Sequence, residues 1–451
     1  MASRRALWVA SLAQLVVVLD VSVVNVALPS MQYELGMGTA MTSWVATGYS
    51  VAFAGALLAA ARLADGIGAA RVLLWSTVAF TVASILGGLA VTGWMLVAAR
   101  VGQGLAAAAL SPATFTLLTV NYREGPDRTR AIAVWTAVSV AGGGVGNIVS
   151  GALTEFSSWR AVLLINVPIG VLVVVGARRL MSGRRPTPAA GVRWSSAAAS
   201  VLAFGSAVYA LSLFAERGRI SGQVLVAFAL SVVLASVWVR RDRVSAVPLI
   251  PPSLWRREGI AFGTAATALT AICFQVSIWY FLTFRFQQDW GYTPIQTGLA
   301  FLPLTVSLLA VNLAVVPRLL DRVGARVLIT AGALIAASGV WWIGWSSAGS
   351  FWVAVLGPSL VIGIGGGLMN TPLATVVTSG VPEAEAGAAS GLMNTAKQFG
   401  GALGLSAATA AITVSGNERA PYVVMAVALL AAAAITTARS AEPLRNRTSS
   451  L

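Results

Sequence analysis

Three charged residues lie inside long apolar stretches, where a charge has to have a partner or a purpose. They are Asp20, Arg100 and Lys397, each surrounded by about twenty mainly apolar residues. A charged side chain at such a position costs roughly 2.5–3.5 kcal/mol on membrane-insertion scales. Asp20 is the only acid well inside such a stretch, and the chain has no histidine, so a proton carrier must be a carboxylate. The residue types predict proton binding at Asp20.

The positions of Asp20 and Arg100 agree in depth. With a rise of about 1.5 Å per residue, Asp20 lies roughly 13 Å from the far end of its apolar stretch, and Arg100 roughly 10 Å from the near end of its own. If both helices line one cavity, the two side chains can pair or compete for a proton. Lys397, the only lysine, lies too deep to reach water easily, and its role is open between binding and structure.

Composition identifies lipid as the main solvent of this chain. Of 451 residues, 57% are hydrophobic and 10% are charged, and the mean hydropathy is +0.82. The net charge of +15 comes from short arginine blocks between apolar runs, without the aromatic interleaving of a nucleic-acid surface. One cysteine, Cys273, leaves no disulfide framework, and no metal site or cofactor is expected. The first thirty residues predict a membrane span that stays in the mature protein, and not a signal peptide that is removed.

The apolar runs predict an all-α integral membrane protein with about fourteen transmembrane helices. With the amino terminus inside, the cytoplasmic segments hold 23 arginines and the outer loops five. This bias predicts a multi-pass protein of the bacterial cytoplasmic membrane with both termini cytoplasmic. The expected spans are 7–29, 41–61, 72–92, 94–120, 130–154, 161–178, 195–215, 222–240, 259–284, 295–317, 326–347, 351–379, 387–412 and 421–438.

Two short patterns recur about 256–258 residues apart. Arg62 and Asp65 with Gly68 return as Arg318 and Asp321 with Gly324, and Gly142 with Gly146 returns as Gly400 with Gly404. Such internal repeats are expected where two halves of a chain descend from one duplicated unit. Chance similarity in Gly/Ala-rich helices is the alternative. The expected organisation is a six-helix bundle over 1–180, two extra spans over 181–257, and a second six-helix bundle over 258–451.

Ordered along the chain, several motifs resemble the major facilitator superfamily, specifically its fourteen-span drug:H⁺ antiporter branch. The segment 19–29 (LDVSVVNVALP) is similar to the first-span signature of that branch, and 100–104 (RVGQG) to its R-x-x-Q-G motif. The segment 142–151 (GGGVGNIVSG) resembles the antiporter motif g-x-x-x-G-P-x-x-G-G, with Asn147 in place of proline and Ser150 in place of glycine. The segment 62–73 resembles the cytoplasmic gating loop but lacks several of its glycine and basic residues.

The resemblance implies roles for particular residues. Asp20 and Arg100 would couple transport to protons. Asp65, with Arg62 or Arg71 as partner and Asp321 as its counterpart, would gate the cytoplasmic side. The small residues Gly142, Gly146 and Gly151 would allow close helix packing or rocking. The implied fold is the major facilitator fold of two six-helix bundles with two additional central spans.

Substrate contacts are expected from polar and aromatic residues within the spans. Aromatic residues near 274–284 offer apolar and cation–π surface for a lipophilic or cationic molecule, although an interfacial aromatic belt explains them equally well. The candidates for substrate binding are Asn25, Gln275, Trp279, Phe281 and Lys397.

The expected function is proton-coupled efflux of small lipophilic or drug-like molecules, including antibiotics, by alternating access. The chain would act as a monomer with a small-molecule substrate, protons and the lipid bilayer as partners, without nucleic acid, and not as an enzyme. No Walker-type phosphate loop is present in the sequence, so ATP drive is not expected. Three alternatives stay open: a dedicated exporter of one endogenous metabolite or self-made antibiotic, a proton symporter, and a membrane-embedded enzyme.

Overall fold

A computed structural model describes residues 2–123, 125–180, 194–244, 248, 250–255, 257–347 and 349–438. All regular structure in these ranges is helical, so the all-α prediction is confirmed there. The amino-terminal group consists of α1 (Ala2–Glu34), α2 (Thr39–Ile67), α3 (Ala69–Gly88), α4 (Gly93–Asn121), α5 (Pro126–Phe156), α6 (Trp159–Leu164) and α7 (Asn166–Arg178). Two further helices follow, α8 (Trp194–Arg217) and α9 (Gly222–Arg243).

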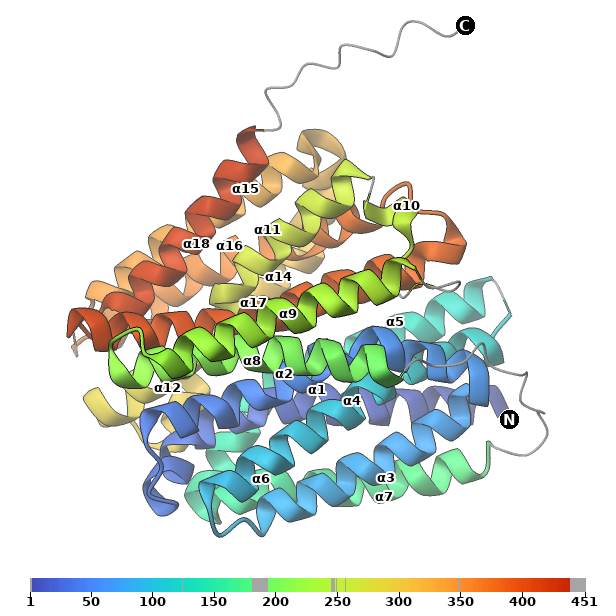
Figure 1. The fold of residues 1–451 in the computed structure, drawn as a ribbon, viewed down its shortest axis with the longest axis horizontal. Helices are drawn as coiled ribbons and strands as arrows, with labels where there is room; N and C mark the ends of the chain where they lie inside the picture. Colours follow the sequence, from blue (N-terminus) through green and yellow to red (C-terminus); the bar gives the residue numbers. More distant parts are fainter. Residues whose placement is uncertain are drawn as a thin grey trace, which may run out of the picture.

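The carboxy-terminal group is more interrupted. Its α-helices are α10 (Pro252–Trp255), α11 (Glu258–Phe274), α12 (Ser277–Phe284), α13 (Pro294–Ala300), α14 (Leu302–Ala310), α15 (Val316–Trp345), α16 (Gly357–Thr378), α17 (Glu383–Ser415) and α18 (Ala420–Ala438). Three π-helical turns join them, η1 (Arg285–Asp289), η2 (Val311–Val315) and η3 (Trp352–Leu356). In Figure 1 the amino-terminal group forms the lower half of the molecule and the carboxy-terminal group most of the upper half, with α8 and α9 between them.

Within the described residues, twelve helical stretches are long and apolar enough to cross a membrane. One of these, Pro294–Trp345, has 52 residues and bends at Gly324. The 33-residue helix α17, which carries Lys397, is not among the twelve. The membrane fold is therefore confirmed, whereas the number of fourteen spans stays a prediction, as does the division into three segments.

Three expected spans are interrupted helices. The stretch expected at 161–178 is interrupted at Ile165 between α6 and α7, and the stretch expected at 295–317 at Phe301 between α13 and α14. The stretch expected at 259–284 is interrupted at Val276, whose φ is −136°. Beside the break at Val276, the carbonyl of Phe274 accepts a hydrogen bond from Nε1 of Trp279 at 2.9 Å. A side chain thus pairs with a backbone group next to the break, where lipid offers no water as a partner.

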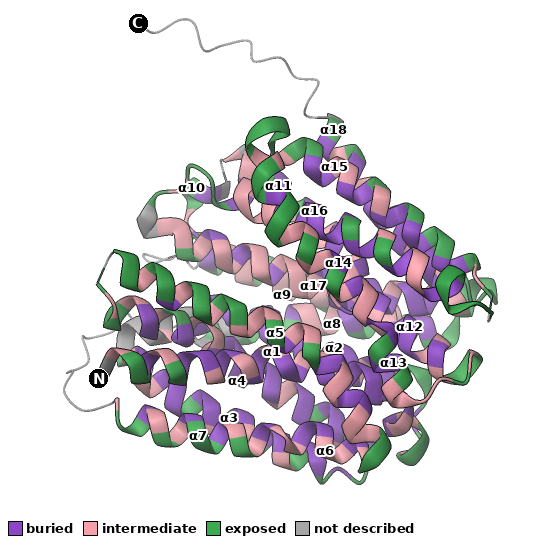
Figure 2. Ribbon diagram, turned by 180° about the vertical axis from the view of Figure 1, so that it is seen from behind, coloured by how far each residue is buried: buried purple, intermediate pink, exposed green. Residues whose placement is uncertain are grey.

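The outer surface is apolar where lipid would touch it. Helix α9 exposes a row of large apolar side chains that no other part of the described structure covers, and Figure 2 shows how unevenly burial is distributed over the helices. Lipid hydrocarbon can surround such side chains without a cost in free energy, whereas their exposure to water is unfavourable. The exposed residues of α9 include Leu225, Val226, Phe228, Leu230, Val232 and Val233.

The repeated sequence patterns correspond to repeated structure. Gly68 and Gly324 both have left-handed backbones, with φ of 93° and 79°, which only glycine adopts without strain. Each therefore turns the chain at the same point of its pattern. Likewise Gly142 packs against Leu15 of α1, and Gly400 packs against Ala268 of α11, so the pair α1–α5 is matched by α11–α17.

The two groups meet closely at the end of the molecule that carries Glu34, which we call the Glu34 end. There Gln287 donates from Nε2 to the carbonyl of Val26 at 2.8 Å, and the backbone N–H of Ile295 donates to Glu155 at 2.9 Å. The opposite end of α5 is largely exposed. Helix α8 bridges the two groups by packing against both α2 and α17.

Candidate functional site

Asp20 and Arg100 form a buried ion pair between α1 and α4. Asp20 is 0% exposed and Arg100 is 2% exposed, and Nη1 of Arg100 lies 2.5 Å from Oδ2 of Asp20. Arg100 also donates to Oε1 of Gln103 at 2.7 Å and to the carbonyl of Val45 at 3.3 Å. Its guanidinium lies 4.8 Å from the ring centroid of Tyr49 on α2, within cation–π range. The contact expected from the matching depths is present, while the proton-coupling role stays a prediction.

The second carboxylate oxygen of Asp20 is held by two amides. Gln103 donates from Nε2 to Oδ1 at 2.8 Å, and Asn166 donates from Nδ2 to the same oxygen at 2.7 Å. Gln103 also donates to the hydroxyl of Ser84 at 2.8 Å. The charged pair therefore lies in a network drawn from α1, α2, α3, α4 and α7, all within the amino-terminal group.

Sequence reasoning missed part of this network. Gln103 was visible because it shares a motif with Arg100, but Asn166, Ser84 and Tyr49 were given no role. A signal existed for Asn166, because an amide near the first turn of an otherwise apolar helix needs a partner in lipid. Ser84 carries no such signal, since a serine in a span usually bonds its own helix.

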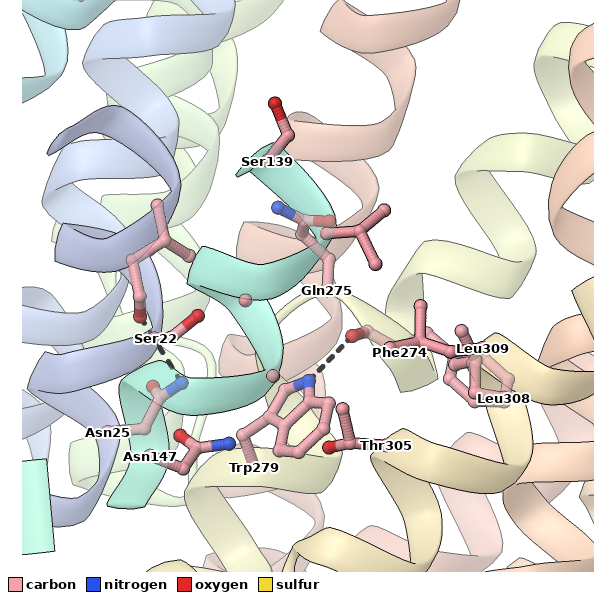
Figure 3. A pocket seen from close by; sticks show the side chains of 14 residues that line it. Ser22, Asn25, Ser139, Asn147, Phe274, Gln275, Trp279, Thr305, Leu308 and Leu309 are labelled. Carbon is pink, nitrogen blue, oxygen red and sulfur yellow. Dashed lines mark hydrogen bonds between the residues drawn. The ribbon is translucent and has the colours of Figure 1, made fainter. Parts of the chain in front are cut away.

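A cavity of about 250 Å³ lies between the two groups of helices. Figure 3 shows its lining, with Ser22, Asn25 and Asn147 from the amino-terminal group facing Gln275, Trp279 and Thr305 from the carboxy-terminal group. Most small-molecule sites occupy about 300–1,000 Å³, so this volume holds part of a drug-sized molecule. The cavity is lined by Val21, Ser22, Asn25, Ser139, Val140, Gly143, Gly144, Asn147, Phe274, Gln275, Trp279, Thr305, Leu308 and Leu309.

Helix α1 connects the charged network to this cavity. Asp20 points toward α4 and α7, whereas Val21, Ser22 and Asn25 on the following turn line the cavity. A change in the contacts of Asp20 therefore acts on the helix that also forms a cavity wall.

The remaining substrate candidates lie in different places. Asn25, Gln275 and Trp279 line the cavity, but Phe281 is 9% exposed and packs edge-on against Tyr280. Lys397 does not line the cavity, and it makes no hydrogen bond or ion pair with any residue that the structure describes. Its neighbour Gln398 accepts a hydrogen bond from Gln275 at 3.0 Å.

The gating residues lie in helices rather than in the loop expected from sequence. Residues 62–67 continue α2, and the turn is confined to Gly68. The backbone of Arg62 and Asp65 is helical, and their side chains are outside the described part. Arg71 is half-buried in the first turn of α3, and Asp321 is exposed in α15.

The three motif glycines have two kinds of neighbour. Gly142 and Gly146 face α1, where they adjoin Leu15 and Ser22. Gly151 faces the other group of helices, and a Cβ there would lie 2.5 Å from the carbonyl oxygen of Pro294. Helix α5 thus packs on its own group with one part and on α13 with another. In the part of the chain that the structure describes, no cluster of three or more potential metal ligands occurs.

A membrane-embedded helical protein with two similar halves and a cavity between them has the architecture of a transporter. The family model described as Major Facilitator Superfamily matches residues 10–405, and the chain belongs to that family of membrane transporters. It is 44% identical to the cephamycin export protein CmcT of Amycolatopsis lactamdurans over 96% of this chain and 91% of that protein. It is 35% identical to the puromycin resistance protein pur8 of Streptomyces alboniger, over 91% and 81% of the two chains.

Solved structures support the fold. A POT family transporter in complex with 5-aminolevulinic acid superposes with a TM-score of 0.72, covering 96% of each chain at 13% identity. The POT family transporter PepTSo superposes with a TM-score of 0.70 at 15% identity, covering 97% of this chain and 98% of that one. At these identities the likeness concerns the fold alone. The expected major facilitator fold is confirmed.

Proposed function

We propose that this protein exports antibiotic-like small molecules across the bacterial cytoplasmic membrane in exchange for protons. It would belong to the fourteen-span drug:H⁺ antiporter branch and work as a monomer with both termini in the cytoplasm. The names of the relatives support the export of antibiotics. The observation that carries proton exchange is the buried carboxylate of Asp20, held by Arg100 on a helix that also lines the cavity.

The hydrogen bonds of Asp20 determine where a proton would add. Oδ1 already accepts from both Gln103 and Asn166, which fills its two lone pairs. The proton therefore adds to Oδ2, the oxygen that Arg100 contacts. Protonation at Oδ2 removes the negative charge that attracts the guanidinium, so the ion pair is reduced to a hydrogen bond with a neutral carboxyl oxygen.

Protonation of Asp20 would thus weaken its contact with Arg100 without unfolding the site. Arg100 keeps its contacts with the carbonyl of Val45, the amide oxygen of Gln103 and the ring of Tyr49. Asp20 keeps its two amide donors. The attraction that is lost is the ionic one between α1 and α4, while Gln103 still joins the two helices through Oδ1. The weaker connection would allow α1 to shift its cavity wall. Binding a proton from outside and releasing substrate there become linked through one helix.

One observation favours a narrower version of this function. The relative that is 44% identical is named for the export of a single antibiotic, cephamycin. A dedicated exporter of one antibiotic would use the same coupling network with a more selective cavity. Growth inhibition by a panel of antibiotics distinguishes the two versions, since a dedicated exporter protects against one chemical class only.

The test of proton exchange uses the full chain in proteoliposomes. A pH gradient, acidic on the side from which protons enter, should drive puromycin uptake into the acidic interior. A protonophore should abolish the uptake. Transport that proceeds equally with and without a pH gradient or membrane potential contradicts proton exchange, while the absence of any puromycin transport contradicts the broader export function.

A further inference from the structure

The hydroxyl groups that line the cavity have already used their hydrogens. Ser22 donates to the carbonyl of Val18 at 3.2 Å, Ser139 to that of Trp135 at 3.0 Å, and Thr305 to that of Phe301 at 3.1 Å. Each donation goes to the preceding turn of the same helix. The oxygen atoms of these hydroxyls remain available to a ligand as acceptors only.

The indole N–H and one of the two N–H groups on each amide are used in the same way. Asn25 donates to the carbonyl of Val21 at 3.4 Å, Gln275 to Gln398 at 3.0 Å, and Trp279 to Phe274 at 2.9 Å. The amide oxygens of Asn25 and Gln275 remain as acceptors. None of the fourteen side chains that line the cavity is charged. The cavity therefore offers a ligand more oxygen acceptors than free N–H donors, and no counter-ion.

Asn147 is the exception among the lining residues, because its side chain has no hydrogen bond at all within the described structure. It is 2% exposed, and its Oδ1 is fully buried. Buried amides are almost always paired, so an unpaired one at a cavity wall needs an explanation. Figure 3 shows Asn147 beside Asn25 and Trp279 on the cavity wall.

The backbone around Asn147 is closely packed on two sides. Gly298 of α13 packs so closely that a Cβ there would lie 2.5 Å from the carbonyl oxygen of Asn147. On the other side, Gly146 adjoins Ser22 of α1. Helix α5 is thus held between α1 and α13 at this point, and the amide of Asn147 is kept at the wall without a partner. The same position is the proline of the antiporter motif that this chain lacks.

We propose that Asn147 is a specificity-determining residue whose amide oxygen accepts a hydrogen bond from the substrate. The cavity would select uncharged or cationic molecules that present N–H or O–H donors, and it would disfavour carboxylates. An anion would meet acceptor oxygens without a cation, whereas an amine gains those oxygens and the faces of Trp279 and Phe274. The inference rests on the proposed export function, since it assigns the substrate class of that site.

The first arm of the test measures binding to the purified full chain in lipid nanodiscs. The probes are puromycin, which has a cationic amine with amide and hydroxyl donors, and cefoxitin, a cephamycin with a carboxylate. The wild type should bind puromycin more tightly than cefoxitin. Asn147→Leu, which keeps the size and removes the amide, should weaken puromycin binding roughly tenfold. The matched control Asn121→Leu makes the same change at an exposed site at the end of α4 and should leave binding unchanged.

Asn147→Asp separates recognition from structure. It keeps the shape and the acceptors but adds a negative charge, so it should preserve or tighten puromycin binding and weaken cefoxitin binding further. A purely structural role moves both probes in the same direction. This variant also keeps the proposal testable if Asn147→Leu fails to fold. Equal binding of puromycin by the wild type and Asn147→Leu, tighter binding of cefoxitin by the wild type, or no binding of either probe overturns the proposal.

The second arm measures export of puromycin by the same variants in proteoliposomes. Binding that depends on Asn147 without any export supports this inference and contradicts the proposed function. Export that is indifferent to Asn147→Leu supports the proposed function and overturns this inference.

Discussion

Nδ2 of Asn166, near the start of α7, lies 2.7 Å from Oδ1 of Asp20 in the middle of α1. This contact crosses the amino-terminal group and places an uncharged donor on the carboxylate oxygen that Arg100 does not touch. The two oxygens of Asp20 thus have different partners, one neutral and one charged. The following predictions depend on that division.

Asp20→Asn should abolish exchange of substrate for protons. The amide can still accept from Gln103 and Asn166, but it can neither bind nor release a proton. Proton movement on addition of puromycin, measured with a pH-sensitive dye in proteoliposomes, should fall to background. Asp127→Asn, at the exposed first turn of α5, is the matched control and should leave the signal intact. Wild-type stoichiometry in Asp20→Asn would assign the proton to another residue.

Replacing Asp20 and replacing Arg100 should lower the stability of the protein by different amounts. Asp20→Asn leaves Arg100 buried with a charge that it cannot lose, and breaking a buried pair in this way costs roughly 3–5 kcal/mol. Arg100→Gln leaves a carboxyl that can neutralise itself by binding a proton, so it should cost less. The double variant Asp20→Asn with Arg100→Gln should recover much of the stability and none of the coupling. Thermal unfolding in detergent checks the order, and equal losses for the two single variants contradict it.

Arg100→Lys should retain more transport than Arg100→Ala but less than the wild type. The guanidinium contacts Asp20, Gln103 and the carbonyl of Val45 at the same time. An ammonium keeps the charge but cannot reproduce a planar fork of donors. Initial rates of puromycin export, corrected for the amount of protein inserted, should follow this order. A lysine variant as inactive as the alanine variant would show that charge alone contributes nothing.

Gly151→Ala should prevent the two groups of helices from closing at the Glu34 end. Its new Cβ would lie 2.5 Å from the carbonyl oxygen of Pro294 and 2.8 Å from Cα of Ile295, and backbone atoms cannot yield locally. Transport should fall, and the distance between spin labels at Phe156 and Gln288 should increase. Gly205→Ala, whose Cβ would lie 3.8 Å from Val51, is the control for an added methyl group. An unchanged spin-label distance in Gly151→Ala contradicts the closure role.

The orientation predicted from the arginine bias can be tested with single cysteines. Cys273 is 0% exposed, so the wild type should not react with an impermeant thiol reagent. In intact cells the reagent should label Ile220→Cys and spare Thr129→Cys, since these exposed sites lie in an expected outer and an expected inner segment. In broken cells both should react. Labelling of Thr129→Cys alone in intact cells would reverse the orientation.

Sequence reasoning predicted best the features that lipid makes costly or that backbone geometry makes specific. The ion pair of Asp20 and Arg100 was visible because charges in apolar helices need partners. Gly68 and Gly324 recur in the sequence because each adopts a left-handed backbone.

The features that sequence reasoning did not reveal depend on which faces of the helices meet. Ser84 and Asn166 approach Asp20 only after α3 and α7 have packed beside α1. The interruption at Val276 leaves no mark in a continuous apolar run, yet it determines where Gln275 and Trp279 face. In the sequence, Asn147 was noted only because it replaces the proline of the antiporter motif. The structure shows that its amide is unpaired and lies at the cavity wall.

The location of the charged network has an evolutionary consequence. Every residue of that network, from Asp20 to Asn166, comes from the first 166 positions, whereas the cavity takes its walls from both halves of the chain. Recombination between related genes downstream of Asn166 would pass on the charged network intact and exchange only one wall of the cavity. If that network couples transport to protons as we propose, a new substrate specificity could arise in this way without any change in the coupling residues.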